Sequence, residues 1–346
     1  MSVETGKLMA LVLAGAWRAS PPESKCSAES LTRVAPTLLQ TRAGGLAWWR
    51  LRDSDLADIE PAGRLHREYL LDNFQAMVNE RLVIRVITRL QSVGVDPLLA
   101  KGWAVARLYP ERGLRTYEDI DLWVRPRDYA IAVEALKGQV APDYPVEMHQ
   151  RVHLLEPAWD ELYENSRVVS LGEVEVRTLG PEDHLRLLCV YMFYHGVRRP
   201  LWLCDIGAIM ESLPADFNWD YCLRGGPRSS EWLACAFGLA HQVLGASLND
   251  TPLSQRARRL PRWLVPSLLR QWGQEDDPLQ RTALKNPRKS TQLKGVSLRW
   301  PNPIRATVRV RGPFNALPRF PFQVVELLIQ ALQLLVRLPT LLRSSR

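Results

Sequence analysis

Apolar positions recur at helical spacing over much of the chain, most clearly in the segment 62–93. Its apolar side chains mostly follow one another at steps of three and four residues, with charged residues between them, as in an amphipathic helix. Gly94 stands where such a helix would end, and Pro97 lies just beyond it. Residues 1–60 carry shorter apolar runs interrupted by Pro and Gly, so we expect short helices there.

The pattern changes between residues 95 and 180, where short apolar stretches alternate with turn residues. The segment 120–124 is rich in β-formers and alternates as a strand does when one of its faces is wet. We expect the order strand, helix, strand, helix, strand, strand, which makes a small mixed sheet. The expected strands are 96–99, 120–124, 146–152 and 168–178, and the expected helices are 103–109 and 127–138.

Helical spacing returns at Pro181. A proline followed by Glu182 and Asp183 is a typical first helical turn, because proline needs no N–H there and the acids complement the helix dipole. The expected helices are 181–196, 200–213 and 230–246, with others inside 252–273. Residues 276–320 are rich in Pro, Arg and Lys and predict an extended strap, followed by an amphipathic helix over 321–338 that ends at Pro339.

These elements predict an α+β fold in which a small mixed-sheet core is flanked by helical subdomains. A chain of 346 residues has room for two or three such units. The predicted segments are an N-terminal helical subdomain at 1–94, the core at 95–180, a C-terminal helical subdomain at 181–275, and a basic strap with a terminal helix at 276–346.

The amino-acid composition limits the class of protein and the cellular location that we expect. Apolar residues make up 46% and charged residues 24% of the chain, which excludes wholesale disorder. Five widely spaced cysteines without a CxxC pair exclude a disulfide framework and a zinc ribbon, and they favour a reduced, cytoplasmic location. The early apolar run 8–16 is too short to cross a bilayer and no later stretch reaches about 18 apolar residues, so we expect no transmembrane segment.

The net charge of +8 is unevenly distributed, because the segment from Thr251 onward holds 18 Lys and Arg but only four Asp and Glu. A basic C-terminal third predicts affinity for nucleotide phosphates, nucleic acid, an acidic partner or a membrane surface, and the alternative is a solvated basic face. Peripheral membrane contact by 321–338 stays open, although docking of this helix onto the body or onto a partner is preferred.

The candidate chemistry lies in the segment 101–124. Residues two apart in an extended strand point to the same side, so Asp119 and Asp121 would project together. Two such carboxylates repel each other unless a cation neutralises them, and their hard oxygens suit Mg²⁺ or Mn²⁺. Upstream, Lys101 and Gly102 lie at a strand-to-helix junction that can take a phosphate, and Arg115 is a fixed charge suited to phosphate oxygens.

This segment resembles the nucleotidyltransferases with a minimal DNA-polymerase-β-like palm. It is most similar to the bacterial branch described as uncharacterised nucleotidyltransferase family proteins. The matching residues are Lys101-Gly102, Leu108-Tyr109-Pro110, Arg115 and Asp119-Ile120-Asp121-Leu122. The likeness extends to the helical leader ending near Val95, to the helix start at 179–183, and to the segment 195–205.

The resemblance implies transfer of a nucleoside monophosphate, with AMP expected, from a nucleoside triphosphate to a hydroxyl acceptor, with release of pyrophosphate. It implies Asp119 and Asp121 as ligands of Mg²⁺ or Mn²⁺. Lys101 and Gly102 stand where many relatives have a Gly-Ser pair that holds the triphosphate. The acceptor stays open between a protein, a peptide, RNA and a metabolite.

The resemblance also implies a third carboxylate on a neighbouring strand, as a further metal ligand that helps to deprotonate the acceptor. Glu147 and Glu175 are the two candidates, and Glu147 is preferred because it lies in the first strand after the motif helix and near His149. His149 and His153 are four residues apart, a spacing that on a helix would suggest a zinc site. This region is predicted as strand and loop, however, so the alternative is that His149 contacts a phosphate or the acceptor.

His195 and Asp205 lie on consecutive predicted helices at positions that resemble the family. We expect them to pair across the helical hairpin, where they would fix the structure or line the cleft.

Two other classes of function stay open. A catalytically silent nucleotide-binding or adaptor protein could keep the same fold, because the serine is missing and position 147 is Glu rather than Asp. A nucleic-acid-binding module could use the basic third, and its binding would be steeply salt-dependent and independent of triphosphate. The sequence contains no P-loop, GxSxG, HExxH or GxGxxG motif, which excludes the enzyme classes that depend on them.

Overall fold

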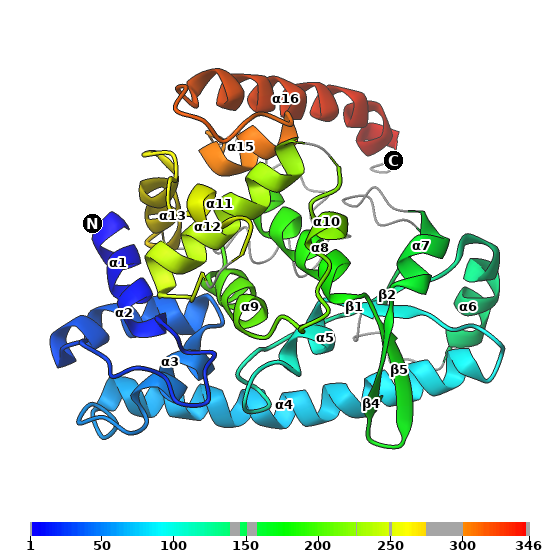
Figure 1. The fold of residues 1–346 in the computed structure, drawn as a ribbon, viewed down its shortest axis with the longest axis horizontal. Coiled ribbons are helices and arrows are strands. Elements are labelled where there is room, and N and C mark those ends of the chain that lie inside the picture. The colour runs from blue at the N-terminus through cyan, green and yellow to red at the C-terminus, as the bar shows by residue number, and fades with distance from the viewer. Residues whose placement is uncertain are drawn as a thin grey trace.

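Within the part of the chain that the structure describes, five short strands form one mixed sheet, on the right in Figure 1. The computed structural model describes residues 2–138, 146–150, 158–225, 227–248, 251–274 and 300–343, with the backbone alone at 2, 227 and 333–343. The strands are β1 (Leu98–Ala100), β2 (Ile120–Trp123), β3 (Val146–His149), β4 (Arg167–Leu171) and β5 (Val174–Thr178).

The strand order is β3-β2-β1-β5-β4. β1 is antiparallel to β2 and parallel to β5, β2 is parallel to β3, and β4 is antiparallel to β5. This arrangement confirms the expected α+β class with a mixed sheet.

The alternation of β2 decides which residues meet the core and which meet the site. Ile120 and Leu122 pack on one face of the sheet, against the long helix α4 (Glu60–Gln91) and α6 (Tyr129–Leu136). Trp123 packs on the opposite face with Leu187 of α8 (Pro181–Tyr194). That second face is not wet as expected, because α8 and its neighbours cover it and Asp121 is only 2% exposed.

Most expected helices are confirmed, including α4, which runs across the lower part of Figure 1, below the helical part of the molecule and across the β4–β5 hairpin. The remaining helices of the described residues, whether expected or not, are α1 (Ser2–Leu13), α2 (Ala28–Gln40), α3 (Gly44–Leu51), α5 (Gly102–Ala106), α7 (Trp159–Glu164), α9 (Pro200–Glu211), α10 (Trp219–Cys222), α11 (Pro227–Leu244), α12 (Ser254–Ala257), α13 (Leu264–Trp272), α15 (Pro303–Arg309) and α16 (Phe320–Arg343), with a 3₁₀ turn η1 (Pro126–Asp128).

One expectation inside the core was wrong, and one helix there was not expected. The segment 168–178 is not one strand but the hairpin β4–β5, which turns at Gly172 with a φ of 60°. Glycine adopts this left-handed conformation without the clash that a Cβ would cause, and so ends one strand and begins the next. The short helix α7 just before this hairpin was not expected.

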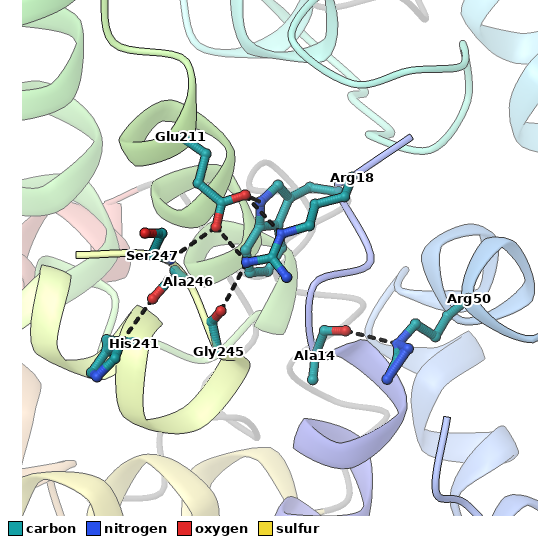
Figure 2. A network of polar contacts seen from close by, with 9 residues as sticks. Ala14, Arg18, Arg50, Glu211, His241, Gly245, Ala246 and Ser247 are labelled. Carbon is teal, nitrogen blue, oxygen red and sulfur yellow. Dashed lines mark hydrogen bonds and ion pairs between the residues drawn. The ribbon is translucent and has the colours of Figure 1, made fainter. Parts of the chain in front are cut away.

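The helices of residues 1–60 and those of residues 181–274 share one hydrophobic core. Figure 2 shows a polar contact between the two parts: Arg18, beyond the end of α1, donates its Nε–H to Oε2 of Glu211 at 2.8 Å. Arg18 also donates to the Gly245 carbonyl at 2.9 Å, and the Ser247 backbone N–H donates to Glu211 at 2.9 Å. The predicted segments 1–94 and 181–275 are therefore in direct contact, although their boundaries stay predictions.

A glycine lets α1 and α13 approach closely, which gives a first prediction. A Cβ on Gly6 would lie 2.0 Å from the Leu269 carbonyl oxygen, so Gly6→Ala must push the two helices apart and should lower the free energy of unfolding by about 1–3 kcal/mol. Gly63 of α4 is the matched control, since nothing lies within 4 Å of its Cβ position. Gly63→Ala should raise stability by roughly 0.5–1 kcal/mol in the same urea titration, because alanine favours the helix. Equal effects at both positions would contradict the close packing.

The C-terminal region differs from the expectation in two ways. Part of the predicted strap is helical, because α15 occupies Pro303–Arg309 and begins at an Asn302 cap; residues 276–299 of that strap lie outside the described part of the chain. The terminal helix does not stop at Pro339, since α16 continues to Arg343. Among the described residues, no helix is long and apolar enough to cross a membrane.

A buried carboxylate on α4 gives a prediction about pH. Burial, assisted by the nearby Glu68 charge, raises the pKa of Asp72 to about 7 from the usual 3.8. The folded protein therefore keeps this proton over a range in which the unfolded chain has lost it, and stability falls as the pH rises from about 4 to about 7. Asp72→Asn should be more stable than the wild type by roughly 2–4 kcal/mol above pH 7 and nearly equal to it at pH 4. Urea unfolding at several pH values measures this, and a difference that does not change with pH would contradict it.

Candidate functional site

The acidic residues of the motif come together on neighbouring parallel strands. The register of β2 and β3 pairs Asp121 with Glu147 and Trp123 with His149, and Asp119 lies one residue before β2. Ligand atoms of Asp121, Glu147 and His149 all lie within 4.8 Å of one another. The parallel pairing of β2 and β3 therefore brings Asp121, Glu147 and His149 together on one face of the sheet. Their spacing in the sequence does not by itself predict this cluster.

Asp121 is the buried centre of this cluster. Its Oδ1 lies 2.7 Å from the Lys101 Nζ and 3.1 Å from the His149 Nε2. Burial opposes ionisation of Asp121, but the contact with His149 and the charge of Lys101 outweigh it, so the pKa lies below the usual value. Asp121 is a carboxylate at neutral pH, balanced by the ammonium group of Lys101.

The pKa of Asp119 is shifted in the opposite direction to that of Asp121. Burial, followed by the negative charge of Asp121, raises its pKa to about 6, while the Lys101 charge acts against the shift. Two carboxylates whose environments separate their pKa values are characteristic of sites that handle protons or bind cations. The neighbouring Glu147 has a side chain that is 54% exposed, so its carboxylate is the open member of the group.

Lys101 is held in an unusual backbone conformation at the junction of β1 and α5. Its φ is 54°, a region that costs a residue with a side chain about 1–3 kcal/mol. The Lys101 backbone N–H donates to the His184 Nε2 at 3.1 Å, and its Nζ lies 4.5 Å from the centre of the Tyr191 ring. Burial, assisted by the charge of Arg107, lowers the pKa of His184 to about 3, which keeps the imidazole neutral and able to accept this bond.

Arg115 binds other residues of the protein interior. It is buried, and its Nη2 lies 2.8 Å from the Asp205 Oδ2 while its Nε lies 3.1 Å from Oδ1. Tyr109 donates its hydroxyl to the same carboxylate at 2.8 Å, and the Arg115 Nη1 donates to the Thr116 carbonyl at 2.8 Å. The structure thus places Arg115 behind the motif loop, and it is not among the residues that line the cavity described below.

The two candidates for the third carboxylate occupy different places. Glu147 joins the Asp121 cluster, whereas Glu175 lies exposed on β5, which β1 separates from β2. His149 belongs to the cluster as well, a position that the sequence left open, and His153 lies outside the described residues.

The expected pairing of His195 with Asp205 was wrong, because Asp205 binds Arg115 and Tyr109. His195 instead packs against the ring of Tyr191, with a distance of 4.5 Å between the two ring centres.

A cavity of about 1050 Å³ opens beside the cluster. One end carries Lys101, Asp119, Glu147 and His149, and one wall is formed by the C-terminal half of α8. The lining continues to the first turn of α11 and to the end of α15. Gly102, the first residue of α5, is buried behind Lys101 rather than in this lining. The cavity is as large as pockets that hold complete cofactors.

The residues present fit a divalent cation. The carboxylates of Asp121 and Glu147 supply hard oxygens, the ligands that Mg²⁺ and Mn²⁺ prefer, and the buried Asp121 is already ionised. His149 adds a nitrogen donor, which extends the choice to other divalent transition metals. A cation here would also lower the repulsion between Asp119 and Asp121.

Comparison with known proteins agrees with this geometry. A family model described as "Uncharacterised nucleotidyltransferase" matches residues 29–141 and 141–245, which include the motif segment, β3 and the α8–α9 hairpin. The searches of the curated proteins and of the solved structures gave no match. The family match covers more than half of the chain, and so this protein belongs to that family of nucleotidyltransferases and is a transferase enzyme.

Proposed function

We propose that the protein transfers a nucleoside monophosphate, with AMP from ATP expected, to a hydroxyl group of its acceptor, with a divalent cation bound at Asp119, Asp121 and Glu147. The proposal rests mainly on the in-register pairing of Asp121 with Glu147, which lines a large cavity, within a chain of the nucleotidyltransferase family. His149 would complete the set of ligands.

The roles of the residues follow from exposure and charge. Mg²⁺ or Mn²⁺, when bound, would neutralise phosphate charge and favour in-line attack at phosphorus. Asp119 and Asp121 hold the negative charge that attracts the cation, because Asp119 lines the cavity and the buried Asp121 lies close enough behind it to influence its pKa. Glu147 is the exposed carboxylate and would accept the proton of the acceptor hydroxyl.

The reaction conserves atoms and charge in a simple way. The acceptor oxygen forms a bond to the α-phosphorus of the triphosphate, the bond from that phosphorus to the β-bridging oxygen breaks, and pyrophosphate leaves with the electron pair. The acceptor proton passes to the Glu147 carboxylate. Lys101, which lines the cavity, would hold the phosphate oxygens with its ammonium group. Gly102 contributes its small size, which lets the chain turn from β1 into α5 behind that lysine.

Arg115 has a different role in this proposal from the phosphate contact predicted from sequence. Its three hydrogen bonds to the buried Asp205 would have to break before it could reach a phosphate. Its charge also lowers the pKa of Asp119, although less strongly than the charge of Lys101 does. We therefore propose that Arg115 positions the loop before β2.

Calorimetric titration of ATP, GTP, CTP and UTP, each with and without Mg²⁺, tests the proposal. The wild type should bind at least one nucleotide in a Mg²⁺-dependent way, and Asp119→Asn should weaken this binding by at least about tenfold, because a ligand charge is lost. Asp55→Asn is the matched control, since Asp55 is exposed on the loop before α4. Metal-independent binding would favour a silent nucleotide-binding protein, and RNA binding without any nucleotide binding would favour the nucleic-acid module.

A further inference from the structure

We propose that the end of the cavity opposite the carboxylates binds a phosphate monoester group on the acceptor, through Arg228 and Arg311. This inference rests on the proposed function, which places the nucleoside triphosphate, the donor of the transferred group, at the carboxylate end of the cavity. It adds the chemical class of the acceptor, which neither the motif nor the family match supplies.

The charges that line the cavity are separated into two ends. The lining carboxylates among the described residues are Asp119 and Glu147, at the end formed by the sheet. The first turn of α11 contributes Arg228 and Ser229, the last residue of α15 is Arg309, and Arg311 lies two residues beyond it. An anion in the cavity is therefore attracted to the α11–α15 end by charges that no lining carboxylate there offsets.

Two of these arginines are free to bind a ligand and one is not. Arg309 is held by Glu326, with Nη1 2.8 Å from Oε1; Glu326 is fully buried and also lies 3.9 Å from the Arg305 Nε, so Arg309 has a structural partner. Arg228 and Arg311 are exposed and form no ion pair with any described residue. Arg186 also lines the cavity, but its partner is the buried Asp183 at 3.4 Å. The two free guanidinium groups carry a charge of +2, which matches the dianion of a phosphate monoester.

The wall between the two ends is aromatic. The Lys101 Nζ lies 4.5 Å from the Tyr191 ring centre, the rings of Tyr191 and His195 are 4.5 Å apart, and those of His195 and Tyr194 are 5.5 Å apart. The guanidinium carbon of Arg309 lies 5.4 Å from the Tyr194 ring centre and completes the path. This succession of rings separates the arginine end from the carboxylates.

The separation assigns the arginine end to the acceptor rather than to the donor. The phosphates that react must lie beside Asp119 and Glu147, where the cation binds. The cavity of about 1050 Å³ is at the upper end of the size range of small-molecule sites, and its lining continues past the aromatic wall to the arginines, where a second substrate would bind. Arg228 and Arg311 would then hold the acceptor by its phosphate while its hydroxyl faces the donor end.

The test uses the full-length protein and two titrations. In the first, inorganic phosphate and glycerol 3-phosphate are titrated into metal-free protein in EDTA, with dimethyl phosphate as the diester probe. Both dianions should bind, dimethyl phosphate should bind about tenfold more weakly, and Arg228→Gln/Arg311→Gln should weaken dianion binding by at least about tenfold. Arg33→Gln/Arg81→Gln is the control with the same charge change, because both of these arginines are exposed on other faces; it should bind like the wild type.

The second titration, MgATP into the same proteins, separates the two proposals. Arg228→Gln/Arg311→Gln should bind MgATP within about twofold of the wild type. If the wild type binds MgATP but dianion binding is absent, or is equal in both arginine variants, the acceptor site is refuted and the proposed function survives. If dianions bind at the arginines but MgATP does not bind to the wild type, the proposed function fails. If loss of the arginines weakens MgATP as much as phosphate, these arginines hold the donor and the assignment to the acceptor is overturned.

Discussion

Replacing Asp121 with asparagine is expected to weaken Mn²⁺ binding by at least about 100-fold and to abolish nucleotidyl transfer. Loss of a residue that only orients a metal ligand typically costs 10–100-fold in affinity, so loss of the ligand itself should cost at least as much. Asp121 is the member of the cluster that is already ionised and buried, and it contacts both Lys101 and His149. Titration of Mn²⁺ followed by the electron spin resonance of the free ion measures the affinity without any acceptor.

The same substitution leaves the Lys101 ammonium group without its carboxylate, so folding must be checked separately. Asp121→Asn/Lys101→Met removes both charges and should restore much of any lost stability without restoring Mn²⁺ binding. Asp58→Asn, at an exposed aspartate before α4, should bind Mn²⁺ like the wild type. Wild-type Mn²⁺ affinity in a folded Asp121→Asn variant would show that the metal does not bind at this cluster.

Replacing Asp205 with alanine is expected to destabilise the protein by about 3–5 kcal/mol, the largest stability effect that we predict. The substitution leaves the buried guanidinium of Arg115 unpaired and the Tyr109 hydroxyl without its acceptor. Removing one partner of a buried ion pair costs this much because the remaining charge is left in a medium that solvates it poorly. Urea unfolding followed by tryptophan fluorescence gives the difference in free energy.

Two further variants test whether the expected loss of stability is due to the burial of the ion pair. Arg115→Met/Asp205→Leu should recover most of the loss, since an apolar pair can replace a buried ion pair of similar volume. Asp216→Ala removes an ion pair with Arg167 of similar length, 2.7 Å, but on the surface, where water screens both charges; it should leave stability unchanged. A loss for Asp216→Ala as large as that for Asp205→Ala would contradict the importance of burial.

The sequence predicted the parts of the site that depend on local periodicity. Alternation along 120–124 puts Ile120 and Leu122 on the same face of β2, and both are packed in one core cluster there. The helical spacing of 62–93 correctly predicted α4, on which the sheet packs. These features depend on a repeat of two or of 3.6 residues, which short segments carry on their own.

The contacts that complete the site depend on chain segments far apart in sequence. Asp121 and His149 are 28 residues apart, and Lys101 and His184 are 83 residues apart. Parallel pairing of β2 with β3 and packing of α8 over the sheet bring them together, and neither event leaves a local pattern. Arg115 illustrates the same limit, because spacing could suggest a charge near a phosphate but could not reveal Asp205 90 residues away.

In the proposed function, Asp119, Asp121 and Glu147 bind the metal that holds the nucleotide. A crystal of the protein grown with Mn²⁺ and a non-hydrolysable ATP analogue, measured for the anomalous scattering of manganese, tests it most directly. We expect a manganese peak within about 2.5 Å of oxygens of these three carboxylates, with the analogue's phosphates on its other side. Bound analogue with manganese elsewhere, or with Lys101 still paired to Asp121 and no manganese at the cluster, would contradict the claim.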